Sequence, residues 1–200
     1  VPISIWVHIE ASYNNADGNF VLYVNGEEDG SDLATGNLAA GTTDLTIGRR
    51  PGISGEENIL TSEYFEGEID EVRVFNAGLS EDEIQKMVYQ ELDETNSFDS
   101  GKIVPLDITA GLGATLVRYY KMDGYKDDIL DDKTTGTIDL SGAKLYNIKD
   151  IYFQTAPLPY QTTSDGAWYS TATWLYGNVW DITDEANNKD WSIVDIQHNV

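Results

Sequence analysis

Short apolar runs separated by turn-forming residues constrain the fold of this chain more than any other feature of its sequence. Residues 5–13, IWVHIEASY, alternate between apolar and polar positions, and residues 20–24, FVLYV, form a second run. The connection between them, NNADGN, is rich in residues that favour a hairpin turn. Residues 44–48 and 65–75 form further strand-like runs with Gly/Asn/Asp-rich connections. Because no helical pattern interrupts this half, we predict antiparallel β structure.

One helix is predicted directly after these strands. Ser80 is an N-cap residue with Glu83 three positions later, which is the capping-box pattern, and Leu79 with Ile84 forms a hydrophobic staple. Apolar residues then recur at helical spacing. We expect this helix to pack on the sheet and to close a domain near Leu92.

Composition excludes several classes of partner and site. The 200 residues include 35 acidic and 12 basic ones, and the resulting net charge of -23 repels nucleic acid and anionic membranes. The absence of cysteine excludes disulfides and thiolate metal sites. No apolar run reaches the roughly 18 residues of a membrane span, and no signal peptide opens the chain. The carboxylates suit calcium, and they equally suit a role in solubility alone.

The run FEGEIDEVRVF at 65–75 holds a dense group of carboxylates, which are Glu68, Asp70 and Glu71. Retaining β-glucanases with a jellyroll fold carry Glu-x-Asp-x-Glu or Glu-x-Asp-x-x-Glu on one strand. Alternate residues share a face, so two carboxylates lie about 5 Å apart there. The second glutamate would fall at Val72 or Arg73 in this chain. We therefore assign no catalytic residue.

The apolar positions of the same run change phase at Asp70 and Glu71, since Phe65 and Ile69 lie in one phase and Val72 in the other. A β-bulge at this point would restore the phase and re-aim the side chain of Asp70. Two interpretations stay open. Asp70 is either a calcium ligand at the domain edge or a cap for local backbone amides.

Four blocks of sequence carry a family resemblance. They are W-x-H-I-x-x-S-Y at 6–13, LYVNG at 22–26, LTIGR at 45–49 and F-x-G-x-I-D-E-V-R-V-F-N-x-x-L-S-x-x-E-I at 65–84. Through them the chain resembles the later part of a laminin-G-like jellyroll of the concanavalin A-like lectin/glucanase superfamily. The resemblance implies an all-β antiparallel jellyroll sandwich, here partial, with one short C-terminal helix. It also implies opening strands upstream of Val1, so we expect a longer parent polypeptide.

A second segment, LVRYYKMDGYKDDILDD at 116–132, resembles the aromatic-rich first strand of such modules. It either opens another jellyroll or supplies a strand to the one before it. In related domains a calcium ion often lies between the Asp of the opening strand and the Asp of a late strand. The resemblance therefore implies calcium as a cofactor, with Asp123 and Asp70 as its ligands.

The tail DGAWYSTATWLYGNVWDI, at 165–182, resembles the start of β-repeat modules in giant surface proteins of gliding and secreting Bacteroidetes. The expected organisation has four parts. They are the end of a jellyroll at 1–92, a linker at 93–112, an acidic β module at 113–160 and the start of a Trp-rich β-repeat module at 161–200.

Aromatic side chains are the candidate ligand-binding residues. Trp168 and Trp174 are candidates for stacking on sugar rings, although Trp more often packs in a core. Tyr119 and Tyr120 are neighbours in a predicted strand and cannot both face its core, so we assign Tyr119 to a binding surface. His8 and His198 show no metal-ligand spacing; His8 is expected to face outward or to pair with a neighbour.

Together these features predict a non-catalytic module of a large secreted bacterial cell-surface adhesin. It would bind glycans or surfaces outside the cell and serve gliding motility. The alternative is a structural spacer that contacts neighbouring modules of the same chain or a secretion or motility machine. A glycoside hydrolase is disfavoured by Val72 and Arg73. Neither nucleic acid nor membrane insertion is expected.

Overall fold

The computed structural model describes residues 6–34, 45–49, 64–88, 90–102, 107–135, 143–145, 160–175, 182–184, 189–191 and 194–200. Within them the structure is mostly β, with antiparallel sheets and little helix, as expected for a partial jellyroll. None of the helices in this described part has the length and hydropathy needed to span a membrane.

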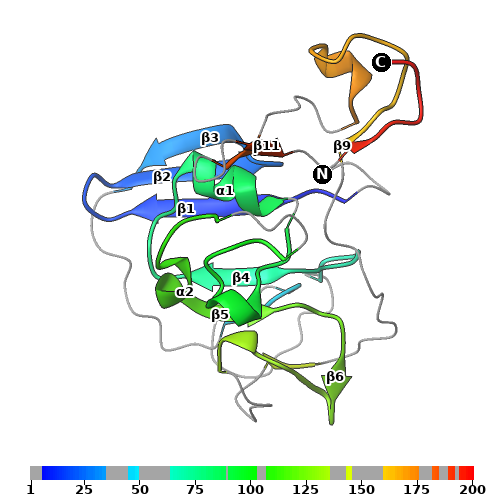
Figure 1. Ribbon diagram of the computed structural model, residues 1–200. Coiled ribbons are helices and arrows are strands. Elements are labelled where there is room, and N and C mark those ends of the chain that lie inside the picture. The colour runs from blue at the N-terminus through cyan, green and yellow to red at the C-terminus, as the bar shows by residue number, and fades with distance from the viewer. Residues whose placement is uncertain are drawn as a thin grey trace.

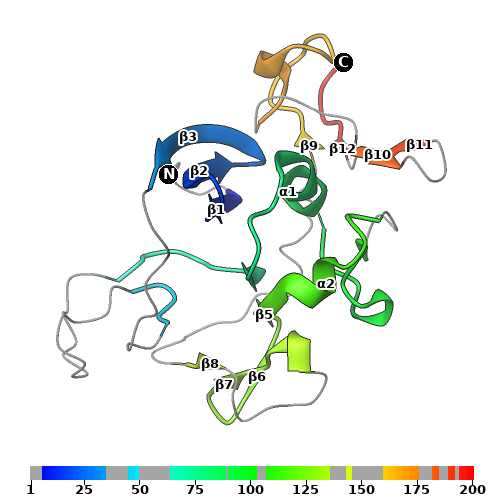
Figure 2. The same cartoon turned by 90° about the vertical axis from the view of Figure 1, so that its left-hand side faces the viewer.

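The first sheet is a three-stranded antiparallel meander of β1 (Ile9–Asn14), β2 (Asn19–Val24) and β3 (Glu27–Leu33). The predicted hairpin joins β1 to β2. Asn25 and Gly26 join β2 to β3, and both have positive φ, as a two-residue type I′ turn requires. Sequence reasoning did not predict β3, because EEDGSDL has no apolar alternation. Figures 1 and 2 show this sheet with a helix against one side.

The second pair of strands is β4 (Val72–Phe75) with β5 (Leu116–Tyr120), joined in antiparallel register from Val72 opposite Tyr120 to Phe75 opposite Leu116. β4 is shorter than the predicted strand 65–75, because Glu71 adopts positive φ and turns the backbone out of extended geometry. The change of apolar phase at Asp70 and Glu71 therefore lies before the β4–β5 ladder. The ladder has a separate shift of register between Val74 and Phe75. A strand was also predicted at 44–48, but residues 45–48, which the structure describes, are not in a strand.

The predicted helix is α1 (Glu81–Val88), and its capping box is formed. The backbone N–H of Ser80 donates to Glu83 Oε2 at 2.8 Å, and the N–H of Glu83 donates to Ser80 Oγ at 3.3 Å. Ile84, Met87 and Val88 are buried, so the apolar stripe of α1 faces inward. The helix prediction is confirmed.

The main core lies between α1, β5 and the segment that connects them. Its buried members are Met87, Leu92, Ile108, Leu112, Leu116 and Tyr119. Ile108 and Leu112 belong to the segment predicted as a linker, which also forms the short helices η1 (Glu94–Asn96) and α2 (Leu112–Thr115). Since β5 pairs with β4, residues 116–120 supply a strand to the preceding unit. The domain boundaries themselves stay predictions.

Smaller β units follow the core. A three-stranded antiparallel sheet consists of β6 (Tyr125–Lys126), β7 (Ile129–Leu130) and β8 (Ala143–Lys144), with η2 (Lys133–Thr135) after β7. Further along, β9 (Tyr160–Gln161) pairs in parallel with β12 (Val194–Asp195). The hairpin of β10 (Ile182–Asp184) and β11 (Lys189–Trp191) and the short η3 (Thr171–Thr173) complete this part.

Candidate functional site

The three carboxylates of the 65–75 run separate in the structure. Glu68 is exposed, Asp70 is half-buried and Glu71 is largely buried. Glu71 Oε2 accepts hydrogen bonds from Arg73 Nη2 at 2.6 Å and from the Tyr119 hydroxyl at 2.7 Å. The buried carboxylate of Glu71 therefore accepts hydrogen bonds from a guanidinium and a phenol. These contacts hold the segments of Glu71, Arg73 and Tyr119 together.

Arg73 is the centre of this arrangement. Its Nη1 donates to the carbonyl of Met87 at 3.1 Å, and its Nη2 also donates to the carbonyl of Gln90. These carbonyls lie at and just beyond the end of α1, where a cation complements the helix dipole. The guanidinium also lies over the Tyr119 ring, with 5.4 Å from Cζ to the ring centroid. Arg73 thus joins the end of α1 to β4 and β5.

Tyr119 was assigned to a binding surface, and this assignment is wrong. The side chain is 0% exposed and belongs to the core, with Phe98 packed edge-on at a centroid distance of 6.0 Å. Burial is the main cause that raises the pKa of its hydroxyl, which stays protonated and donates to Glu71. The neighbouring Tyr120 is buried as well.

The structure brings Asp70 and Asp123 to the same end of the β4–β5 ladder. Burial is the main cause that raises the pKa of Asp70 to about 7, and the charges of Glu71, Asp123 and Glu91 add to it. Asp70 Oδ1 is buried without a hydrogen-bond partner. Asp123 is 3.6 Å from the ammonium of Lys121. A cation beside Asp70 would relieve this repulsion.

Calcium nevertheless fits these residues incompletely. The ion takes six to eight oxygen ligands, whereas no group of three or more His, Cys, Asp or Glu side chains in the described part of the chain is placed to hold a metal. Lys121 already supplies positive charge there, since its Nζ also lies 2.6 Å from Glu91 Oε2. The assignment of Asp70 and Asp123 as calcium ligands stays a prediction.

The two Trp candidates differ in exposure. Trp174 is 3% exposed, and its Nε1 donates to the carbonyl of Trp168 at 2.7 Å, so its ring offers no face to a ligand. Trp168 packs edge-on against Trp174 and keeps 41% of its area exposed. The adjacent Tyr169 is 91% exposed. Sequence reasoning missed Tyr169, although its position in the polar, turn-forming segment that follows Ser164-Asp165-Gly166 was a usable signal.

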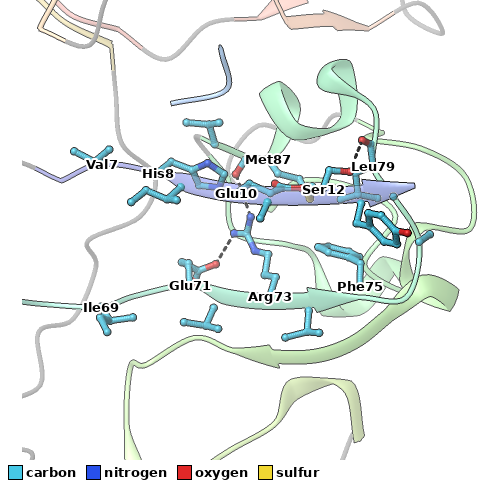
Figure 3. A pocket seen from close by; sticks show the side chains of 18 of the residues that line it. Val7, His8, Glu10, Ser12, Ile69, Glu71, Arg73, Phe75, Leu79 and Met87 are labelled. Carbon is cyan, nitrogen blue, oxygen red and sulfur yellow. Dashed lines mark hydrogen bonds and ion pairs between the residues drawn. The ribbon is translucent and has the colours of Figure 1, made fainter. Parts of the chain in front are cut away.

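A cavity of about 1150 Å³ separates β1 from β4. Figure 3 shows side chains of both strands around it, with Arg73 and Glu71 on the β4 side and His8 and Glu10 on the β1 side. Burial, and then the charge of Arg73, lowers the pKa of His8 to about 4. Burial is the main cause that raises the pKa of Glu10 to about 7. His8 therefore lines a cavity and does not face outward; the other expectation, that it pairs with a neighbour, stays a prediction.

Comparison with known proteins finds a family that the β1–α1 region is similar to. Residues 1–85 match the family described as the concanavalin A-like lectin/glucanases superfamily. No curated protein matches the chain.

Two solved structures resemble parts of the chain. One is an S-layer domain-containing protein from Clostridium thermocellum, with 26% identity over 42% of this chain and a TM-score of 0.36. The other is a provisionally named carbohydrate binding protein from Bacteroides ovatus, with 25% identity over 64% of this chain and a TM-score of 0.44. The matches span only 40% and 31% of those two chains. The family match is the finding on the N-terminal region: residues 1–85 are similar to the concanavalin A-like lectin/glucanase superfamily.

Proposed function

We propose that this chain is a non-catalytic, carbohydrate-binding part of a secreted bacterial cell-surface adhesin. The superfamily of residues 1–85 includes both lectins and glucanases, so the choice between binding and hydrolysis depends on the carboxylates. The observation that carries the proposal is the engagement of Glu71 by Arg73 and Tyr119. These contacts tie Glu71 to the packing of β4, β5 and the end of α1, which supports a structural role for this carboxylate rather than a catalytic one.

The exposed pair Trp168–Tyr169 is the proposed contact for sugar rings. Aromatic faces stack on the apolar faces of sugars, and this pair combines a partly exposed indole with a nearly free phenol ring. Asp165, three residues before Trp168 in the chain, and Asn199 are exposed, with Asp165 Oδ1 accepting from the N–H of Asn199 at 2.9 Å. Polar groups beside an aromatic platform are suited to sugar hydroxyls.

The binding proposal is tested on a glycan array with the 200-residue protein. Tyr169→Ala removes an exposed ring that supports little packing, so we expect glycan binding to fall at least tenfold with an unchanged melting temperature. Tyr125→Ala removes another half-exposed ring, on β6, and is the matched control. Equal loss in both variants would reject the Trp168–Tyr169 contact.

The same protein separates the remaining functions. Release of reducing sugar from a polysaccharide would show that the chain is a hydrolase. Absence of binding to any glycan or abiotic surface would favour the structural spacer, whose contacts are with neighbouring modules or with secretion or motility proteins. We include a role in gliding motility in the proposal because the tail at 165–182 resembles β-repeat modules of gliding bacteria.

Calcium is proposed as a stabilising ion beside Asp70, supported by its unpartnered Oδ1 and the negative charges around it. Binding to the folded state alone raises stability by linkage. We expect the melting temperature to be higher in calcium than in chelator for the wild type, and the difference to vanish in Asp70→Ala. Asp32→Ala, at an exposed position of β3, should keep it. An unchanged transition in the wild type would remove calcium from the proposal.

A further inference from the structure

The exposed aromatic pair Trp168–Tyr169 lies in a strongly acidic stretch of the chain. Residues 160–200 contain six Asp or Glu residues and a single Lys, and the whole chain carries a net charge of -23. A glycan that approaches the pair therefore enters a negative potential, which repels anionic sugars and attracts cationic ones. The sign of this potential is the first indication of which sugars the proposed contact accepts.

Asp165 is the carboxylate that lies nearest to the pair along the chain. It is exposed and stands three residues before Trp168, so the two Cα atoms are at most about 11 Å apart. The backbone N–H of Asn199 donates to Asp165 Oδ1 at 2.9 Å, and the Asn199 Nδ2 donates to Oδ2 at 3.3 Å. These hydrogen bonds, to which the charge of His198 adds, lower the pKa of Asp165. The carboxylate is therefore negative at neutral and mildly acidic pH.

Hydrogen bonds fix the loop that carries both the carboxylate and the rings. The N–H of Gly166 donates to the carbonyl of Asn199 at 3.0 Å, which holds the start of the loop against the end of the chain. Trp174 Nε1 donates to the carbonyl of Trp168 at 2.7 Å, which holds the other side. Figures 1 and 2 show the C-terminal segment beside this loop. The separation of Asp165 from the aromatic pair is therefore set by the fold.

The exposed rings add a second attraction for positive charge. Tyr169 is 91% exposed and Trp168 is 41% exposed, and the negative face of an aromatic ring attracts an ammonium group that lies over it. A glycan of amino sugars carries an ammonium group on each sugar beside an apolar ring face. One such glycan can therefore stack on Tyr169 and also present positive charge to the rings and to Asp165. Acetylation of the amine removes the charge and keeps the sugar ring.

We propose that the Trp168–Tyr169 contact prefers glycans whose sugars carry free amino groups, and that Asp165 is the residue that determines this preference. The inference rests on the proposed function, since it assigns a class of sugar to the same contact. A sugar ring stacks on Tyr169, while its ammonium group or that of the next sugar in the glycan lies toward the carboxylate of Asp165. Uncharged glycans bind through stacking alone, and anionic glycans bind least.

The test compares three hexasaccharides on the 200-residue protein, which are the hexamers of glucosamine, of N-acetylglucosamine and of galacturonic acid. Calorimetric titration at mildly acidic pH, where the sugar amines are protonated, should show at least fivefold tighter binding of the glucosamine hexamer than of its acetylated form. The galacturonic acid hexamer should bind least, and added salt should reduce the preference. Asp165→Asn keeps an acceptor for Asn199 and should at least halve the preference. Asp32→Asn removes the same charge from an exposed position of β3 and should leave the preference unchanged.

The outcomes separate this inference from the proposed function. Equal binding of the glucosamine and N-acetylglucosamine hexamers, with both lost in Tyr169→Ala, would overturn the amino-sugar preference and leave the glycan contact standing. A preference that Asp165→Asn and Asp32→Asn weaken equally would show attraction by the overall charge of the chain, and would also overturn it. If Asp165→Asn lowers the melting temperature, Tyr169→Ala decides, because a glucosamine preference that survives the loss of this ring places the amine elsewhere. Absence of binding to these hexamers and to every glycan on the array would overturn both proposals.

Discussion

Arg73 shows how one side chain links elements that are distant in sequence. Its guanidinium reaches the carboxylate of Glu71 just before its own strand, two carbonyls at and just beyond the end of α1, and the ring of Tyr119 in β5. Since the arginine side chain is only 7% exposed, loss of its charge would leave Glu71 buried without a cation. Removing one partner of a buried pair costs more than the intact pair contributes.

We predict that Arg73→Met lowers the free energy of unfolding by about 3–5 kcal/mol. The matched control is Lys86→Met, which removes the ion pair of Lys86 with the exposed Asp82 and should cost about 0.5 kcal/mol or less. Urea unfolding followed by tryptophan fluorescence measures both. Equal losses in the two variants would contradict the role assigned to Arg73.

Glu10 on β1 should make stability depend on pH. Burial raises its pKa from 4.5 to about 7; Arg73 of β4 opposes this shift and Glu83 of α1 adds to it. Between pH 4.5 and about 7 the folded protein keeps a proton on Glu10 that the unfolded chain has released. The free energy of unfolding therefore falls as the pH rises through this range. His8, whose pKa is lowered to about 4, contributes the opposite slope in both wild type and variant, and cancels from their difference.

We therefore predict that Glu10→Gln gains stability relative to wild type as the pH rises from 4.5 to 7, with a constant difference above that range. Urea unfolding at a series of pH values measures the difference. Ser12→Ala changes the same strand without a titrating group and should show no such trend. A difference that shrinks with rising pH would refute the environment described for Glu10.

At the scale of the element, α1 depends on its first turn. Ser80 and Glu83 satisfy each other's backbone amides, which removes two unpaired donors from the helix start. We predict that Ser80→Ala lowers the free energy of unfolding by about 1 kcal/mol, whereas Ser80→Thr costs less than half of that. Thermal unfolding by circular dichroism measures both variants. An Ala variant as stable as wild type would show that packing alone holds α1.

Local patterns predicted the elements whose signals are local. The capping box gave α1, the turn-flanked apolar runs gave the β1–β2 hairpin, and the aromatic run gave β5. The extended run 65–75 was overestimated: the phase change at Asp70 and Glu71 indicated an irregularity there, but it did not indicate that Glu71 adopts positive φ and that the strand begins only after it. β3 was missed because its sequence has no apolar alternation. It forms because the Asn25–Gly26 turn brings it back beside β2, where its backbone pairs.

The candidate site was less predictable, because exposure depends on partners far away in the chain. Tyr119 is buried by Phe98 and by its hydrogen bond to Glu71, 48 positions earlier. Trp174 is covered through Trp168. The approach of Asp70 to Asp123 was implied by family resemblance, and it requires the β4–β5 ladder, which no spacing rule supplies.

At the scale of the whole molecule, the core crosses the expected boundary at residue 92. Met87 and Leu92 lie before it, and Ile108, Leu112 and Tyr119 lie after it. We predict that a chain of residues 1–92 does not fold, because it loses most of this cluster, whereas a chain of residues 1–135 does. Dispersion of amide and methyl signals in proton NMR distinguishes the two. Cooperative unfolding of the shorter chain would restore a domain boundary at residue 92.

The distances along the chain between paired strands set an order of events during folding. The β1–β2 hairpin closes over about four residues, since Asn14 pairs with Asn19. The β4–β5 ladder closes over about 40, since Phe75 pairs with Leu116. Hairpins form in about 1–10 μs, whereas distant pairings must first overcome the entropy of a long loop. The rate-limiting step of refolding should therefore be the arrival of Tyr119 beside Glu71, after the meander already exists.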